Sequence, residues 1–103
     1  MPTQSGTDGV AELAALPSLG LASARMLVEA GVPDASTLRR LGAIECFRRL
    51  RFHHGKRATL NFVYAIECAC HGLDWRLLEE GRKAELRSAA RAVADELQRQ
   101  PKG

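Results

Sequence analysis

The residues best suited to metal chemistry are three cysteines and three histidines. The densest group is Cys68-Ala69-Cys70-His71, and a second group is His53-His54. If residues 68–71 are helical, side chains two positions apart point about 200° away from each other, so Cys68 and Cys70 cannot share one ion. A structural zinc site needs four ligands, usually with two residues between paired cysteines, and this chain has no such pair. We therefore expect the cysteines to pack in the core and predict no metal or other cofactor.

The sequence also lacks the common patterns of a catalytic site. It has no glycine-rich phosphate loop followed by lysine, no nucleophile elbow and no carboxylate pair in an evident cleft. Glu67 is the best candidate for a functional acid, because it lies in the most apolar segment. A salt bridge or a backbone contact is the simpler interpretation of a carboxylate there. The sequence thus predicts a protein that is not an enzyme and has no small-molecule substrate.

Basic side chains are concentrated in one stretch. Residues 39–57 hold seven basic residues and one acid, Glu45, whereas the rest of the chain has eight basic and eleven acidic residues. This asymmetry creates a field that could attract an acidic partner such as DNA, although a solvated helix face is the commoner origin of a charge run. Arg48 and Arg51 are expected to face solvent. The residues predicted to contact phosphates are Arg39, Arg40, Arg48, Arg51, Lys56 and Arg57.

A second candidate contact is a tight turn between two helices near the start of the chain. Pro17 cannot continue a helix, and Gly20 is expected to use backbone angles closed to other residues. The helix that follows begins with unpaired N–H groups and a partial positive charge, which suit a phosphate. A plain helix–helix corner is the alternative. The residues predicted to bind nucleic acid here are Ser18, Leu19, Gly20, Ser23 and Arg25.

Apolar residues that recur every three or four positions predict the helices that carry these residues. One face of the second helix is expected to hold Leu21, Ala24, Leu27 and Val28. Residues 58–71 are apolar on nearly every side, so this helix should lie at the centre, with Asn61 and Glu67 as polar exceptions. Trp75 is expected to plug one end of the core. The predicted helices span residues 10–16, 21–31, 35–41, 43–53, 58–71 and 79–98.

These elements predict an all-α fold, a compact bundle of about five helices with a helix–hairpin–helix-like N-terminal corner. Asp8 is a plausible cap for the first helix, and no segment alternates as a strand would. The expected organisation is a flexible lead-in over residues 1–9, one helical domain over 10–99 and a flexible tail over 100–103. A short pattern, Leu16-x-x-Leu19-Gly20-x-x-x-Ala24, also recurs as Leu38-x-x-Leu41-Gly42-x-x-x-Cys46 and suggests a weak internal repeat.

Composition places the chain among ordinary globular domains. Its 103 residues suffice for one modest core, with 46% hydrophobic and 26% charged residues. No apolar run approaches the roughly 20 residues of a membrane span, and no basic region precedes an apolar run at the start. The odd number of cysteines favours a reducing compartment. We therefore expect a cytoplasmic protein that does not contact a membrane.

The ordered set of these residues resembles the C-terminal domain of the TfoX/Sxy family, regulators of natural competence for DNA transformation. The match spans most of residues 16–86. The matching positions are Leu19-Gly20, Ser23, Leu27, Gly31-Val32, Leu38, Leu41-Gly42-Ala43, Phe47, Leu50, Leu60-Asn61, Tyr64-Ala65, Glu67, Gly72, Trp75 and Leu86.

The resemblance implies a compact helical domain whose opening hairpin is similar to the helix–hairpin–helix of DNA-binding proteins. Full-length family members carry this domain after an α/β domain, for which this chain has no room, and act with the cyclic-AMP receptor protein at competence promoters. Ser18 stands where DNA-binding hairpins usually have the first glycine of Gly-x-Gly. We therefore expect a regulatory module that binds DNA weakly and without sequence preference. The alternative is a module that contacts a transcription regulator or polymerase through the same arginines.

Overall fold

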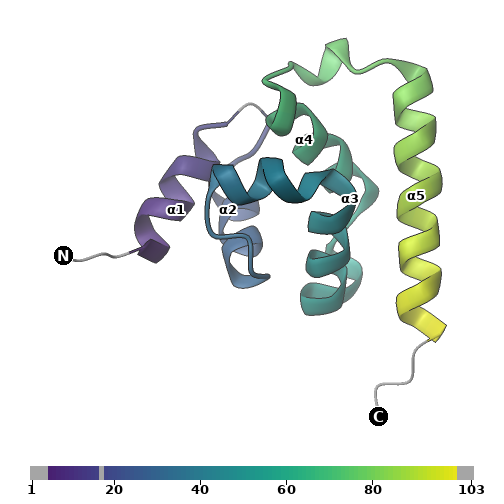
Figure 1. Cartoon of the computed structure of the whole chain (residues 1–103), viewed down its shortest axis with the longest axis horizontal. Coiled ribbons are helices and arrows are strands. Elements are labelled where there is room, and N and C mark those ends of the chain that lie inside the picture. Colours follow the sequence, from purple (N-terminus) through teal and green to yellow (C-terminus); the bar gives the residue numbers. More distant parts are fainter. Residues whose placement is uncertain (1–4, 17, 100–103) are drawn as a thin grey trace.

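The computed structural model describes residues 5–16 and 18–99, and this part of the chain is all-α (Figure 1). The predicted fold class is confirmed, and no strand occurs in the described ranges. None of the described helices has the length and apolar composition of a membrane span. The elements are α1 (Ser5–Ala14), α2 (Leu21–Glu29), α3 (Ala35–His54), the 3-10 turn η1 (Gly55–Arg57), α4 (Leu60–His71), the 3-10 turn η2 (Trp75–Leu77) and α5 (Glu80–Arg99).

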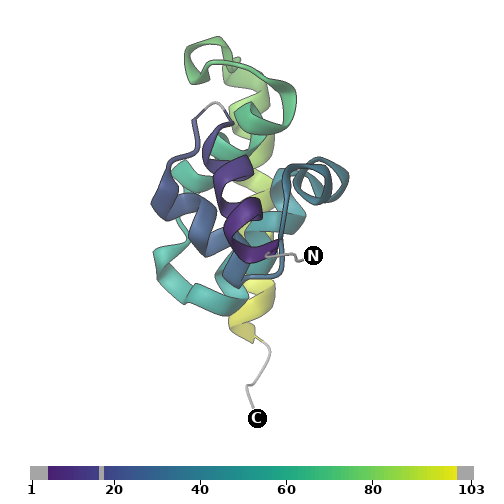
Figure 2. The ribbon, with the colours of Figure 1, turned by 90° about the vertical axis from the view of Figure 1, so that its left-hand side faces the viewer.

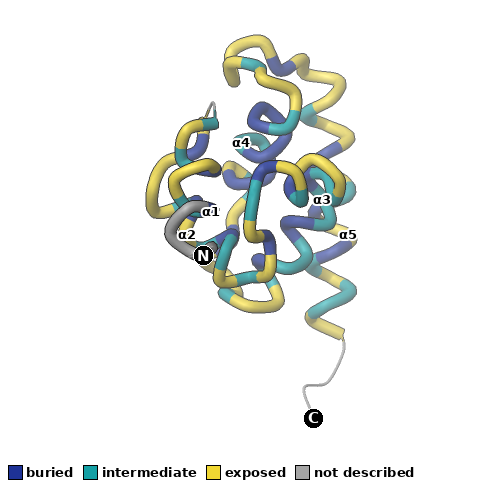
Figure 3. The backbone as a smooth tube through the Cα atoms, turned by 60° about the vertical axis from the view of Figure 1, so that its left-hand side comes forward, coloured by how far each residue is buried: buried dark blue, intermediate teal, exposed yellow. Residues whose placement is uncertain are grey.

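The helices are arranged around α4. Helices α3 and α5 both pack against it, while α1 and α2 form a hairpin that contacts α3 (Figures 1 and 2). Val63 and Ile66 of α4 are fully buried, and Phe62, Cys68 and Ala69 are buried beside them (Figure 3). Removing one such aliphatic side chain from water stabilises a fold by about 1.5–3 kcal/mol. The prediction that residues 58–71 form the central helix is thus confirmed, with the helix beginning at Leu60.

Glu67 is the buried charge of α4, and its partner comes from α5. Glu67 is 6% exposed, and its carboxylate accepts two hydrogen bonds from the Arg82 guanidinium, at 2.7 and 3.3 Å. The Nε2 atom of His71 lies 3.4 Å from the same carboxylate. Hydrogen bonding to Glu67 is the largest cause that raises the pKa of Arg82, so the guanidinium stays charged. The predicted salt bridge is confirmed, and it fastens α5 to the central helix.

A kink at Gly42 divides α3 into two arms. Gly42 has φ 82° and ψ 169°, which are not helical angles and which favour glycine, so the predicted break is confirmed. Carbonyls at the end of a helix lack intrahelical partners. The Leu38 carbonyl, four residues before the break, accepts from the thiols of Cys46, at 3.9 Å, and Cys70, at 3.7 Å. The kink lets the first arm cross α4 while the second arm runs beside α5 (Figure 1).

The first helix differs from the prediction. It begins at Ser5 rather than Val10 and ends at Ala14, so Asp8 lies inside the helix instead of capping it. Gly9, expected in a flexible lead-in, is buried, and a Cβ atom there would overlap the carbonyl oxygen of Pro33. The glycine therefore permits α1 to approach the chain at Pro33 closely. Pro17 and the expected flexible ends at residues 1–4 and 100–103 lie outside the described residues.

Two expectations about the core are wrong. Trp75 is 60% exposed and does not plug the core. It lies on the short turn η2, and Leu78, the residue after this turn, is buried instead. Asn61, expected as a polar exception inside the fold, is exposed on the first turn of α4. Apolar periodicity over residues 79–98 predicts a stripe of Leu86, Ala90, Val93 and Leu97 on the last helix. In α5 the first three are buried and Leu97 is half-buried, so the stripe is confirmed.

The Glu67–Arg82 pair predicts a measurable coupling. Arg82→Met would leave the Glu67 carboxylate buried without its guanidinium partner, and the His71 imidazole would be the basic group of the described chain that still lies within 4 Å of it. Because Arg82 is 46% exposed, we expect a loss of about 1–3 kcal/mol, less than for a fully buried pair. Urea denaturation measures this loss. The double variant Glu67→Gln with Arg82→Met should recover part of it, and purely additive losses would show that the two side chains are not coupled.

The packing of α1 predicts opposite effects for two glycine substitutions. Gly9→Ala should lower the free energy of unfolding by about 1–3 kcal/mol, because the new methyl group overlaps the Pro33 backbone. Gly81→Ala is the matched control within α5, where nothing lies within 4 Å of the added atom. It should be neutral or stabilise by up to about 1 kcal/mol, since alanine favours a helix over glycine. Thermal melts that rank the two variants the other way would refute the close approach.

Candidate nucleic-acid interface

The hairpin between α1 and α2 presents the start of α2 to solvent. Gly20 occupies the N-cap position, and its carbonyl accepts the N–H of Ala24 at 2.9 Å. No side chain caps the helix, so the N–H groups of its first turn remain available to an anion. Ser18 and Gly20 are exposed and Ser23 is half-buried, whereas the Leu19 side chain belongs to the core. Leu19 can therefore contribute only its backbone to a phosphate contact.

The turn uses serine, not glycine, for its unusual backbone angle. Ser18 has φ 70°, a conformation that favours glycine, while Gly20 has φ −107° and ψ −178°, which most residues can adopt. The expectation for Gly20 is thus wrong. Leu21 also departs from prediction, because it is exposed while Ala24 and Leu27 are buried. Leu21 lies on the first helical turn of α2, close to the backbone turn at Ser18 and away from the core.

The structure separates the predicted basic residues into two groups. Those of the first group are exposed and form no ion pair with any other residue of the described ranges: Arg25, Arg39, Arg40, Lys56 and Arg57.

The second group is engaged within the fold. Arg48 lies 2.8 Å from Glu96 of α5 and 3.3 Å from Glu45, and the hydrogen bond with Glu96 is the largest cause that raises its pKa. Arg51 donates to the Ala58 carbonyl at 3.0 Å. Both arginines are half-buried. The expectation that they simply face solvent is wrong, because Arg48 is paired with Glu96 of α5 and Arg51 is bonded to the backbone that follows η1.

The exposed cations do not form one continuous patch. Ser18 of the hairpin lies beside Cys68, and Arg39 follows Leu38, which contacts Cys70, so both lie near the C-terminal end of α4. Lys56 and Arg57 belong to η1, which precedes the opposite end of the same helix. A helix of 12 residues is about 18 Å long. The positive charges therefore lie near both ends of α4, and the length of that helix separates Arg39 from Lys56 and Arg57.

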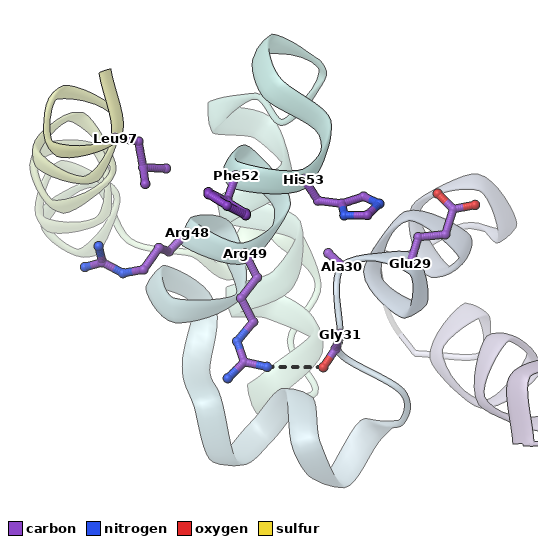
Figure 4. A pocket seen from close by; sticks show the side chains of 8 residues that line it. All are labelled: Glu29, Ala30, Gly31, Arg48, Arg49, Phe52, His53 and Leu97. Atoms are coloured by element: carbon purple, nitrogen blue, oxygen red, sulfur yellow. Dashed lines mark hydrogen bonds between the residues drawn. The ribbon is translucent and has the colours of Figure 1, made fainter. Parts of the chain in front are cut away.

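One pocket of about 450 Å³ lies between the second arm of α3, the end of α2 and α5, and we name it the Phe52 pocket (Figure 4). Phe52 is 71% exposed, and Arg49 donates to the Gly31 carbonyl at 3.2 Å across the pocket. Sequence reasoning missed this site. The available signal was Phe52, an aromatic residue that lies off the helix face that buries Phe47 and Leu50. The pocket is lined by Glu29, Ala30, Gly31, Arg48, Arg49, Phe52, His53 and Leu97.

A smaller pocket of about 250 Å³ lies beside the hairpin, and we name it the Trp75 pocket. Its position joins three segments that are distant in sequence: the turn before α2, one face of α4 and η2. The sequence signal that could have indicated it is a tryptophan in a short polar turn. The lining residues are Ser18, Asn61, Tyr64, Ala65 and Trp75.

The cysteines are poor metal ligands in this fold. Burial is the largest cause that raises the pKa of all three thiols, and that of Cys46 reaches about 12. A thiol must lose its proton to bind a metal or act as a nucleophile, and a raised pKa favours the protonated form of all three. Within the described ranges, no three His, Cys, Asp or Glu residues gather around a point where an ion could sit.

Comparisons with known proteins agree with the predicted family. Residues 10–90 match the TfoX C-terminal domain. The chain is 31% identical over 71 residues to the DNA transformation protein TfoX1 of Aliivibrio fischeri, a match that covers 69% of this chain and 34% of the relative. It thus spans about a third of that protein's length.

Solved structures share the fold. A triclinic crystal structure of a Listeria monocytogenes protein has a TM-score of 0.74 and 28% identity, covering 79% of this chain and 91% of that one. A tetragonal crystal structure from the same organism has a TM-score of 0.73 and 28% identity, covering 78% and 98% of the two chains. With 79% of the chain matched in space and the family's sequence pattern running from α1 to α5, the chain belongs to the TfoX C-terminal domain family.

Proposed function

We propose that this chain is a non-enzymatic regulatory module of the competence and DNA-transformation type that acts in the cytoplasm. Its family membership supports that role, since a relative is a DNA transformation protein. The proposed activity is weak binding of duplex DNA without sequence preference. Such binding would keep the module near DNA while another component selects the site.

The observation that carries this proposal is the group of exposed cations without acidic partners among the described residues. Arg25 lies on α2, the helix whose start has no side-chain cap. Arg39 and Arg40 lie on the first arm of α3. Each cation that reaches a phosphate releases condensed counterions, which favours binding to any sequence. The free N–H groups at the start of α2 would add one oriented phosphate contact.

A second candidate function is binding of a transcription-regulatory protein. The Phe52 pocket favours it, because an exposed phenylalanine beside Leu97 offers apolar contact and Arg48 and Arg49 lie at the rim. Large exposed apolar side chains with arginine nearby are typical of protein interfaces. The partner would present an apolar residue to Phe52, and its acidic surface would meet the exposed arginines that form no ion pair in the described ranges.

Charge reversal at Arg39 and Arg40 tests DNA binding. The variant Arg39→Glu with Arg40→Glu should fold normally, since both side chains are exposed and unpaired among the described residues. It should weaken binding to every duplex sequence equally and reduce the slope of log K against log salt by about two. Fluorescence anisotropy at several salt concentrations measures both effects.

The control variant is Arg91→Glu with Arg99→Glu on α5, which changes net charge by the same amount. Equal losses in the two variants would mean that total charge alone governs binding. No NMR shift of the hairpin amides with duplex DNA, even at low salt, would refute the proposal.

Phe52 distinguishes the two functions. Phe52→Ser should leave DNA affinity and the melting temperature unchanged, because the ring is mostly exposed. If the module binds a regulatory protein through this pocket, the same variant should lower that affinity by about 10-fold or more. Isothermal titration with a purified competence regulator measures it, and an unchanged affinity would exclude the Phe52 pocket as the docking site.

A further inference from the structure

The Trp75 side chain is exposed where it lines the Trp75 pocket, so its aromatic ring is accessible to a ligand. It is the only tryptophan in the chain, and η2 holds it in the lining of the Trp75 pocket, to which Ser18 of the hairpin also contributes. The Asp74 carboxylate accepts from the Arg76 N–H at 2.9 Å, which fixes the turn that carries the ring. Neither the buried core nor the proposed duplex contacts account for this residue.

Two cationic side chains of α5 lie against Tyr64, the second aromatic ring that lines the Trp75 pocket. The Nζ atom of Lys83 lies 5.9 Å from the centre of the Tyr64 ring, and Arg87 donates to the Tyr64 hydroxyl at 3.2 Å. Glu80, whose side chain is largely exposed, is 3.5 Å from Lys83, so it offsets that charge only weakly. Arg87 forms no ion pair with another described residue. The pocket therefore combines aromatic walls with a positive edge.

We propose that the Trp75 pocket binds one unpaired base of single-stranded DNA. The base stacks on Trp75 beside Tyr64, and Arg87 and Lys83 contact a neighbouring phosphate. Aromatic side chains within a cationic groove are the usual means of binding single strands without sequence preference. This inference rests on the proposed function, because it assumes that the module binds DNA, and it specifies the form of DNA that this face takes.

The chemistry of the pocket favours a base over a protein segment. Its volume of about 250 Å³ is below the roughly 300–1,000 Å³ of sites for drug-sized ligands, so it suits one flat ring system. The exposed Asn61 amide and Ser18 hydroxyl can donate to and accept from the polar edge of any base. Lys56 and Arg57 precede the helix that carries Asn61, so a strand running along α4 would meet further cations.

Tryptophan fluorescence tests this proposal directly, because all of the indole emission comes from Trp75. Titration with a short oligothymidylate should quench the emission, since a stacked base deactivates the excited indole. Trp75→Ala should weaken binding of the oligothymidylate, measured by anisotropy, by roughly 5- to 100-fold. Trp75→Phe should retain part of the affinity. Leu77→Ala is the matched control, because Leu77 is 64% exposed on the same turn but does not line the pocket.

The outcomes separate this inference from the proposed function. Duplex binding is followed separately by the anisotropy of a labelled duplex, and Trp75→Ala should leave it unchanged. Normal duplex binding with no effect of Trp75→Ala on oligothymidylate would overturn the pocket alone. If the wild-type protein bound neither duplex DNA nor oligothymidylate, both proposals would be overturned. A shift in Trp75 emission that depends on protein concentration, without DNA, would assign the pocket to a second copy of the chain and overturn the inference.

Discussion

Burial of α4 on most of its circumference is the constraint on which the rest of this fold depends. A helix whose Phe62, Val63 and Ile66 all avoid water must be enclosed, and two helices with polar outer faces, α3 and α5, enclose it. The candidate binding groups are consequently confined to its margins. Ser18 and Arg39 lie near its C-terminal end, whereas Lys56 and Arg57 precede its start.

The same enclosure divides the arginines by role. Arg82 is held by buried Glu67, and Arg48 bridges to Glu96, so both guanidinium groups connect helices. Arg39 and Arg40 lie on the crossing arm of α3 and form no ion pair with another residue of the described ranges. A charge that holds two helices together cannot also meet a phosphate without losing its partner. The surface that can bind DNA is thus smaller than the count of basic residues indicates.

Breaks in the helices place these surfaces. The kink at Gly42 turns the first arm of α3 across α4 and exposes its arginines, while the second arm meets α5. The turn at Ser18 brings the hairpin to the face of α4 that carries Tyr64, so the start of α2 and the Trp75 pocket adjoin. Two faces result: one displays isolated cations, and the other combines aromatic rings with cations. Both suit nucleic acid, the first by charge and the second by stacking.

The sequence by itself determined the all-α class, the central helix, the break at Gly42 and the stripe of Leu86, Ala90, Val93 and half-buried Leu97. These follow from hydrophobic periodicity and from glycine, which act over a few residues. Tertiary structure alone decided the start of α1, because the close approach of Gly9 to Pro33 is not a local property. It also decided which arginines are free and which are paired, since Glu96 lies 48 positions after Arg48 in the chain. Trp75 and Ser18 meet in one pocket only because α4 lies between their segments, and no local pattern encodes a contact between residues so far apart.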